Sequence, residues 1–223
     1  MRAATAGGRT MTARPYGTAA FKYRTASWKV PLPATKKTPP EGFTGWEHAD
    51  TWPDDDQIAA WVRTSGRRNI TLRLHREMVG LDVDAWKGES FVETMKAISA
   101  AHGILPRTWV SNSRSDSSGI RLFRLPFETK QGELAGNIKH PDGGDRIAGE
   151  VIHHGHRTAV VWPSIHPVTG EPYRWIYQST GEISAGYLGR QSCRCLRRRG
   201  SITSAVSAHV SPGRFGPLNQ RTR

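Results

Sequence analysis

The stretch VGLDVDAW, residues 79–86, places two carboxylates inside an apolar run, and the interpretation of the whole chain starts from it. Its valines and leucine are typical of a β-strand. Side chains alternate between the faces of a strand, so Asp82 and Asp84 share one face while Leu81 and Val83 point into a core on the other. The two aspartate Cα atoms are expected about 7 Å apart. Both carboxylates can therefore converge on one cation or on a close pair of metal ions.

Two like charges at this spacing repel each other, and their repulsion raises a carboxyl pKa unless a cation neutralises them. Divalent Mg²⁺ or Mn²⁺ is a suitable neutraliser, because hard cations prefer carboxylate oxygens. A pair of aspartates separated by one residue also occurs on solvated edge strands. From these two residues alone, a metal site and a solvated edge both stay open.

The hydrophobic pattern along the chain predicts an α+β fold, with helices beside several antiparallel strands. A proline-rich stretch at 30–46 is predicted to be a loop, as is the polar stretch 128–146. Thr51 is a candidate cap for the second helix. The strands at 149–154 and 157–164 are expected to pair around Gly155. The predicted helices are 14–28, 51–64 and 89–102, and the predicted strands are 69–74, 78–85, 107–112, 120–125, 149–154, 157–164 and 171–178.

Charge is distributed unevenly along the 223 residues, and this suggests the domain organisation. The net charge is +13, but the segment after Glu182 contains eight arginines and no acidic residue, which leaves +5 for the rest. We predict a flexible leader at 1–13, one catalytic domain at 14–180 and a basic, disordered tail at 181–223. The positive charge suggests a nucleic-acid partner rather than a membrane. An end without acids also suits translation in a shifted reading frame, and that alternative stays open.

The cysteines and histidines suggest neither a disulfide framework nor a zinc site. Cys193 and Cys195 form a single C-x-C pair, which cannot complete a four-ligand site. The histidines of HHGH at 153–156 lack a fourth ligand nearby, so we expect solvated turn histidines. No apolar run approaches the length of a membrane span, and no signal peptide is visible at the N-terminus. A reducing, cytoplasmic location fits these observations.

The order of several motifs is more specific than any one of them. The chain resembles the bifunctional primase/polymerase N-terminal domain of the archaeo-eukaryotic primase superfamily, as carried by plasmids and phages, from about Tyr16 to Trp175. That resemblance implies a catalytic core with a mostly antiparallel, RRM-like sheet flanked by helices. The motifs that support it are VPLPATKKTPPEGFTGW at 30–46, DDDQIAAWV at 54–62, VGLDVDAW at 79–86, SSGIRLFRL at 117–125 and GEVIHHGHRTAVVWPSIHP at 149–167.

The resemblance implies a two-metal site with Mg²⁺ or Mn²⁺. Asp82 and Asp84 match the carboxylates of the first catalytic motif, and Glu150 matches the third acidic position. We prefer Glu150 over the nearby Asp145 because Glu150 opens an apolar strand. Three carboxylates around two metals would activate a 3′-hydroxyl and stabilise the leaving pyrophosphate.

The resemblance also implies nucleotide-binding residues. Ser118 belongs to a tight turn whose backbone amides can face phosphate. Arg121 stands where the family usually has a histidine, and an arginine there can still bind a triphosphate. Ser164 and His166 come from the third motif. Lys37, in the proline-rich stretch, either contacts template phosphate or is solvated.

We therefore expect a metal-dependent DNA primase/polymerase that makes or extends primers from nucleoside triphosphates. Its template would be single-stranded or primed DNA, and a separate replicative helicase is a further candidate partner. Two alternatives stay open. One is a catalytically decayed primase fold that binds nucleic acid, suggested by the missing histidine and the unusual tail. The other is a metal-dependent nuclease that uses the same carboxylates.

Overall fold

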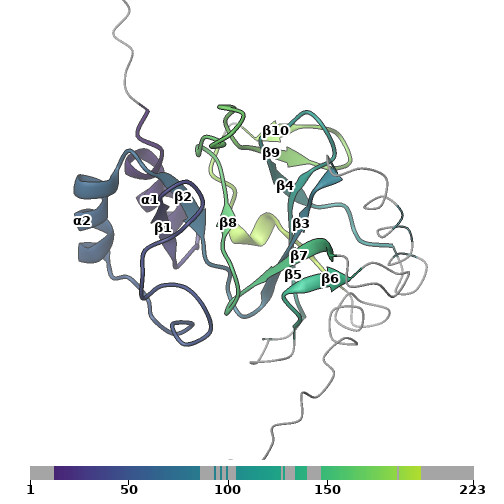
Figure 1. Ribbon diagram of the computed structural model, residues 1–223, viewed down its shortest axis with the longest axis horizontal. Helices are drawn as coiled ribbons and strands as arrows, with labels where there is room; N and C mark the ends of the chain where they lie inside the picture. Colours follow the sequence, from purple (N-terminus) through teal and green to yellow (C-terminus); the bar gives the residue numbers. More distant parts are fainter. Residues whose placement is uncertain are drawn as a thin grey trace, which may run out of the picture.

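The structure is a computed structural model, and over the continuous ranges that it describes, helices α1 (Pro15–Thr25) and α2 (Asp55–Ser65) pack with two β-sheets (Figure 1). Both helices are grouped with strands β1 and β2 on one side of the molecule, and the larger sheet lies on the other. Among the described residues, no helix is long and apolar enough to span a bilayer. The structure describes residues 13–85, 93, 96, 99, 104–126, 128, 134–139, 147–184 and 186–196.

The two helices begin where the sequence supplies suitable residues. Helix α1 (Pro15–Thr25) has a proline in its first turn, where a missing N–H costs no hydrogen bond. Helix α2 (Asp55–Ser65) is capped by Asp54, whose carboxylate accepts a hydrogen bond of 2.7 Å from the Gln57 N–H. The prediction of Thr51 as the cap was wrong, because Asp54 lies immediately before the first helical residue and Thr51 lies four residues away from it.

The smaller sheet has the order β1-β2-β8 and is antiparallel throughout. It consists of β1 (Pro31–Ala34), β2 (Asn69–Leu72) and β8 (Ala159–Val160). The prediction that residues 30–46 form only a loop was wrong for β1. Pro31 and Pro33 alternate on an edge strand, so their missing N–H groups can fall on the side that has no partner strand.

The larger sheet has the order β10-β9-β4-β5-β3-β7-β6, with β11 also pairing with β5. Every pair in it is antiparallel except β11 with β5. Together with the helices, this gives the mostly antiparallel α+β architecture that was expected. The strands are β3 (Met78–Val83), β4 (Trp109–Asn112), β5 (Gly119–Arg124), β6 (Asn137–Lys139), β7 (Ile147–His153), β9 (Arg174–Tyr177), β10 (Ile183–Ser184) and β11 (Arg194–Cys195).

Strand β3 divides the core into two clusters, because its side chains alternate between the faces of the large sheet. Met78 joins the cluster that contains α1 and the small sheet, with Trp28 and Trp175 fully buried in it. Val79 and Leu81 join the cluster on the opposite face. Each large apolar side chain buried in this way contributes roughly 1.5–3 kcal/mol to folding.

Three further predictions about elements differ from the structure or lie outside it. β6 falls inside the stretch 128–146 that was expected to be a loop. β7 and β8 were expected to pair with each other, but they belong to different sheets. Between them, the described chain forms an isolated antiparallel bridge from His153 to His156. The helix expected at 89–102 lies mostly outside the described residues.

The segment 183–196 is packed against the fold, so the prediction of a disordered tail from residue 181 was wrong over this segment. Leu188, Cys193 and Leu196 are buried. The Trp28 indole N–H donates to the Leu188 carbonyl at 2.9 Å. Apolar residues spaced between the arginines supply this packing, although the overall composition of the segment is polar. Residues 197–223 lie outside the described residues.

The histidines of the HHGH turn are also less exposed than expected. His153 is 8% exposed and His154 is 1% exposed. Burial lowers the pKa of His153 to about 4, with help from the neighbouring histidines. Burial likewise lowers the pKa of His75 to about 4, with help from Arg190 and Lys29. Both side chains are therefore neutral in the folded protein at neutral pH.

We predict that the folded state loses stability in mild acid. An unfolded histidine has a pKa near 6.5, so below that value the unfolded chain binds protons that folded His75 and His153 do not bind. Stability is full above about pH 7 and falls as the pH drops from 6.5 toward 4, by at most about 3 kcal/mol per histidine. Urea unfolding across this range measures the effect, and His153→Gln should flatten the profile. A free energy of unfolding that is equal at pH 7.5 and pH 5 would contradict the prediction.

Candidate active site

The pairing of β3 with β7 brings the first and third predicted acids of the site, Asp82 and Glu150, together. Asp82 lies directly opposite Glu150 in the antiparallel register. Residues paired in this way have Cβ atoms about 4.5–5.5 Å apart on the same face. Asp84 follows the last residue of β3. All three carboxylates line one pocket, so residues 66 or more positions apart in the sequence become neighbours.

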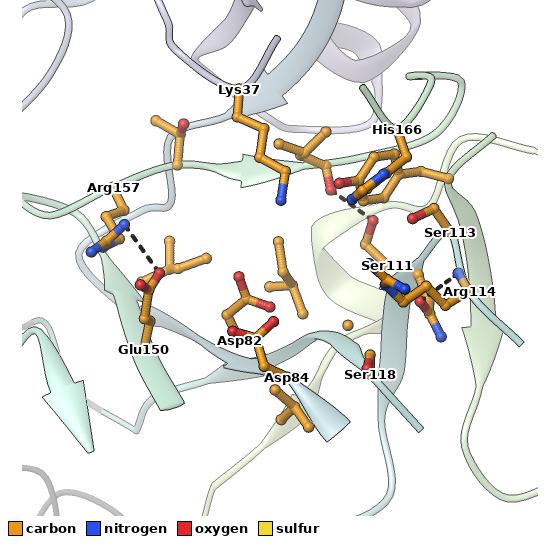
Figure 2. A pocket seen from close by; sticks show the side chains of 18 of the residues that line it. Lys37, Asp82, Asp84, Ser111, Ser113, Arg114, Ser118, Glu150, Arg157 and His166 are labelled. Atoms are coloured by element: carbon orange, nitrogen blue, oxygen red, sulfur yellow. Dashed lines mark hydrogen bonds and ion pairs between the residues drawn. The ribbon is translucent and has the colours of Figure 1, made fainter. Parts of the chain in front are cut away.

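This pocket has a volume of about 700 Å³, which is within the usual range for small-molecule sites. Figure 2 shows the acids on its floor, the turn that carries Lys37 above them, and His166 with Ser111 and Ser113 at one end. The polar lining consists of Lys37, Thr38, Thr44, Asp82, Asp84, Ser111, Asn112, Ser113, Arg114, Ser118, Glu150, Arg157, Thr158, His166 and Tyr173.

Three cationic side chains line the same pocket as the three carboxylates. Lys37 is at the tip of a tight turn closed by two backbone hydrogen bonds of 2.9 Å between Thr35 and Thr38. Its amino group points toward the aspartates in Figure 2. Arg114 follows β4. Arg157 forms an ion pair of 3.1 Å with Glu150. The formal charges of these six side chains cancel.

His166 is held as a neutral hydrogen-bond donor at the pocket wall. Its Nδ1 accepts hydrogen bonds from the backbone N–H groups of Val168 at 3.3 Å and Thr169 at 3.2 Å. Nδ1 therefore carries no proton, and the proton of the neutral ring is on Nε2. Burial, followed by the positive charges of Lys37 and Arg114, lowers the His166 pKa. At neutral pH the ring can donate one hydrogen bond from Nε2.

The turn before β5 contributes an unpaired hydroxyl. Ser118 is 5% exposed, and its Oγ has no hydrogen-bond partner among the described residues. Its backbone N–H donates to the Asp116 carboxylate at 2.8 Å, so this amide is not directed at a ligand. Gly119 has a φ of +119°, and a Cβ there would lie 2.6 Å from the Ser111 carbonyl oxygen. Only glycine allows β5 to start this close to β4.

A comparison with protein families identifies the fold that carries this pocket. A model of the bifunctional DNA primase/polymerase N-terminal domain matches residues 20–185. The chain belongs to this family. The searches of curated proteins and of solved structures returned no match. Membership implies primase or polymerase activity on a DNA template with nucleotides, and such polymerases typically depend on metal ions.

In this primase/polymerase domain, Arg121 lies away from the pocket. It pairs with Leu81 in the β3–β5 register, so it is on the face opposite that of Asp82. Its guanidinium donates to the carbonyl of Ser117 at 2.7 Å and to that of Gly119 at 3.2 Å. Arg121 is not among the residues that line the pocket. The nucleotide-binding role expected for it is therefore not supported, and the side chain instead braces the turn before β5.

Ser164 is likewise used inside the fold. It is fully buried, and its hydroxyl both donates to the Ile70 carbonyl and accepts from the Ile70 N–H, each at 2.8 Å. It is absent from the pocket lining. These two bonds join β2 to the segment that follows β8 (Ala159–Val160). The expected contact of Ser164 with a nucleotide is therefore not supported either.

The carboxylates do not converge in the way that a loaded metal site requires. Within the described part of the chain, no group of three histidine, cysteine, aspartate or glutamate side chains is close enough to hold an ion. Figure 2 shows Glu150 directed toward Arg157, beside the two aspartates. The donor set nevertheless fits Mg²⁺ or Mn²⁺, because all three candidates supply carboxylate oxygens. The expected two-metal site remains a prediction.

Several lining residues have no clear signal in the sequence. Arg157 directly follows the HHGH turn, and no motif of the sequence marks it as a site residue. Arg114 is in a polar turn that resembles any surface loop. Tyr173 lies in a predicted strand and lines the pocket while remaining 6% exposed. Lys37, for which contact with template phosphate and a solvated side chain were both considered, lines the pocket.

We predict that Ser164→Ala destabilises the fold without weakening nucleotide binding. The variant leaves the buried Ile70 N–H without its partner, which costs about 1–3 kcal/mol, while the Ile70 carbonyl keeps a hydrogen bond from the Val161 N–H at 3.3 Å. Urea unfolding measures the loss, and titration with a fluorescent nucleoside triphosphate measures binding. A variant with unchanged stability and a tenfold weaker affinity for the nucleotide would restore the original assignment.

Proposed function

We propose that this protein is a DNA-templated nucleotidyltransferase that makes or extends primers, in replication of the plasmid or phage type, by two-metal catalysis. The observation that carries the proposal is the pocket itself. In a chain of the primase/polymerase family, it combines Asp82, Asp84 and Glu150 with a wall of cationic side chains. Few reactions besides phosphoryl transfer need both features in one cavity.

The carboxylates of Asp82, Asp84 and Glu150 would hold the divalent ions. When bound, Mg²⁺ or Mn²⁺ supplies activation of a 3′-hydroxyl and charge stabilisation on the triphosphate. The residues themselves contribute a fixed platform. Asp82 and Glu150 belong to the paired strands β3 and β7, so their backbones are held by the sheet rather than by a loop.

Three groups opposite the acids are suited to bind the triphosphate. His166 offers its Nε2 proton, and Lys37 and Arg114 offer permanent charge. The unpaired hydroxyl of Ser118 offers a further donor on the pocket wall. A triphosphate held there would lie between these cations and the carboxylates, which is the arrangement that in-line nucleotide transfer needs.

The partners follow from the same proposal. The template is single-stranded or primed DNA, and the substrates are nucleoside triphosphates. A separate helicase stays a prediction, since no contact within the described residues bears on it.

We predict that Asp82→Asn combined with Asp84→Asn reduces primer extension by at least about a thousandfold, because both changes remove metal ligands needed in the transition state. Extension of a labelled primer with Mn²⁺ or Mg²⁺ measures this. Glu171→Gln is the matched control, since Glu171 is an exposed carboxylate that pairs with Arg174 at 3.7 Å. Equal activity in the double variant and the control would remove the two aspartates from the mechanism.

We also predict that His166→Ala raises the KM for the nucleoside triphosphate about tenfold, because it removes one hydrogen bond to a charged phosphate. The rate at saturating nucleotide should fall less than the KM rises. Steady-state extension at varied nucleotide concentration separates the two constants. An unchanged KM with a lower kcat would place His166 elsewhere in the reaction.

One observation favours the second candidate, a primase fold that binds nucleic acid without catalysis. Arg121 replaces the family's usual histidine and lies on the face of the sheet away from the acids. Single-strand binding without metal-dependent incorporation would support this candidate. Analysis of the products would separate chain growth from the cleavage expected of a nuclease.

A further inference from the structure

The Glu150–Arg157 ion pair places a cation of the chain itself on an acid of the proposed metal site. Arg157 Nη1 lies 3.1 Å from Glu150 Oε2. Both side chains are partly open to solvent, at 47% and 32% exposure respectively. Figure 2 shows the pair at one end of the pocket, beside Asp82 and Asp84. A guanidinium in this position and a divalent ion would compete for the same carboxylate oxygens.

The turn that presents Arg157 is held firmly. His153 and His156 exchange two backbone hydrogen bonds of 3.0 Å. Gly155, between them, lies so close to Trp46 that an added Cβ would be 1.6 Å from the indole ring. The backbone at the base of the Arg157 side chain is thus fixed relative to β7, and the long side chain is the part that can move.

Two local features direct the guanidinium toward Glu150. Arg157 has a φ of +60°, a conformation that a non-glycine residue adopts at a cost in free energy. Its Nε donates to His156 Nε2 at 3.2 Å, which leaves the Nη groups for the carboxylate. Retaining a strained arginine at this position suggests that its side chain has a task in the pocket.

We propose that the Arg157 guanidinium occupies the position of a metal ion on Glu150. When a divalent ion binds Glu150, the guanidinium is displaced and binds the triphosphate instead. This inference rests on the proposed function. Without a metal ion, Arg157 supplies the counter-charge on Glu150 and so reduces the repulsion between this carboxylate and the neighbouring aspartates. When the ion binds Glu150, the displaced guanidinium stays within the same pocket, where its planar fork matches phosphate as well as carboxylate.

The exchange of Arg157 for a metal ion requires little free energy. Ion pairs between partly exposed side chains contribute little to stability, so separating Arg157 from Glu150 costs little. The displaced guanidinium can bind the nucleotide, because its planar fork of donors matches a phosphate group. Arg157 would thus be a nucleotide-binding residue that acts only in the metal-loaded state.

The first test measures Mn²⁺ binding without nucleotide, by electron paramagnetic resonance of the free ion. Arg157→Asn removes the competitor, and asparagine tolerates a positive φ better than most residues. We expect Mn²⁺ to bind about fivefold more tightly than to the wild type, the factor expected for losing one partly exposed ion pair. Arg174→Asn is the matched control, because Arg174 also pairs with a carboxylate, that of Glu171 at 3.7 Å, and does not line the pocket. It should change the Mn²⁺ affinity less than twofold.

The second test asks whether the effect passes through Glu150. In a Glu150→Gln background, Arg157→Asn should leave Mn²⁺ affinity unchanged, because the competition has been removed already. With saturating Mn²⁺, Arg157→Asn should weaken binding of a non-hydrolysable nucleoside triphosphate about tenfold, through loss of a charge-assisted contact. Without metal, the same variant should bind that analogue as the wild type does.

The outcomes distinguish the failure of this inference from the failure of the proposed function. If Arg157→Asn and Arg174→Asn tighten Mn²⁺ binding equally, or if the Arg157 effect persists in the Glu150→Gln background, the role proposed for Arg157 is wrong and the metal site stands. If the wild type binds no Mn²⁺ that depends on Asp82 and Asp84, the proposed function itself fails.

Discussion

The antiparallel register between β3 and β7 is the constraint on which the pocket depends. It pairs Asp82 with Glu150, and a shift of one residue would turn Glu150 to the opposite face, among the apolar residues of the second core cluster. The register is held from both sides, because Leu81 and Val151 are buried on one face while Ile152 is buried on the other. The same apolar alternation that forms the core therefore aligns the acids.

Charge balance is the second property that links the fold to its proposed chemistry. Carboxylates close together repel one another. The cationic side chains of Lys37, Arg114 and Arg157 line the same cavity and offset this repulsion. These cations come from three separate segments: the turn after β1, the turn after β4 and the turn after β7. A pocket with both cations and carboxylates on its walls suits a substrate that brings its own negative charge together with a divalent ion.

Part of this site could be predicted from the sequence, and the errors share a cause. Strand alternation predicted that Asp82 and Asp84 share one face, and the apolar strand that Glu150 opens favoured it over Asp145. Arg121 and Ser164 were chosen by their position in motifs, without knowledge of which way each side chain would point. The strand pairing turns Arg121 away from the acids, and the Ile70 backbone takes both hydrogen bonds of Ser164. The packed segment 183–196 was missed because its composition resembles that of a disordered tail, although Leu188, Cys193 and Leu196 are buried.

The sequence by itself determined the α+β class and the family, because these depend on residues close together in the chain or on motifs in a fixed order. Only the tertiary structure decided which cations meet the acids and which motif residues belong to the interior. Those outcomes depend on sheet register and on turns that bring distant segments together, and neither is encoded in local periodicity. Arg157 shows this clearly: in the sequence it follows a histidine turn, and in the fold its guanidinium lies on Glu150.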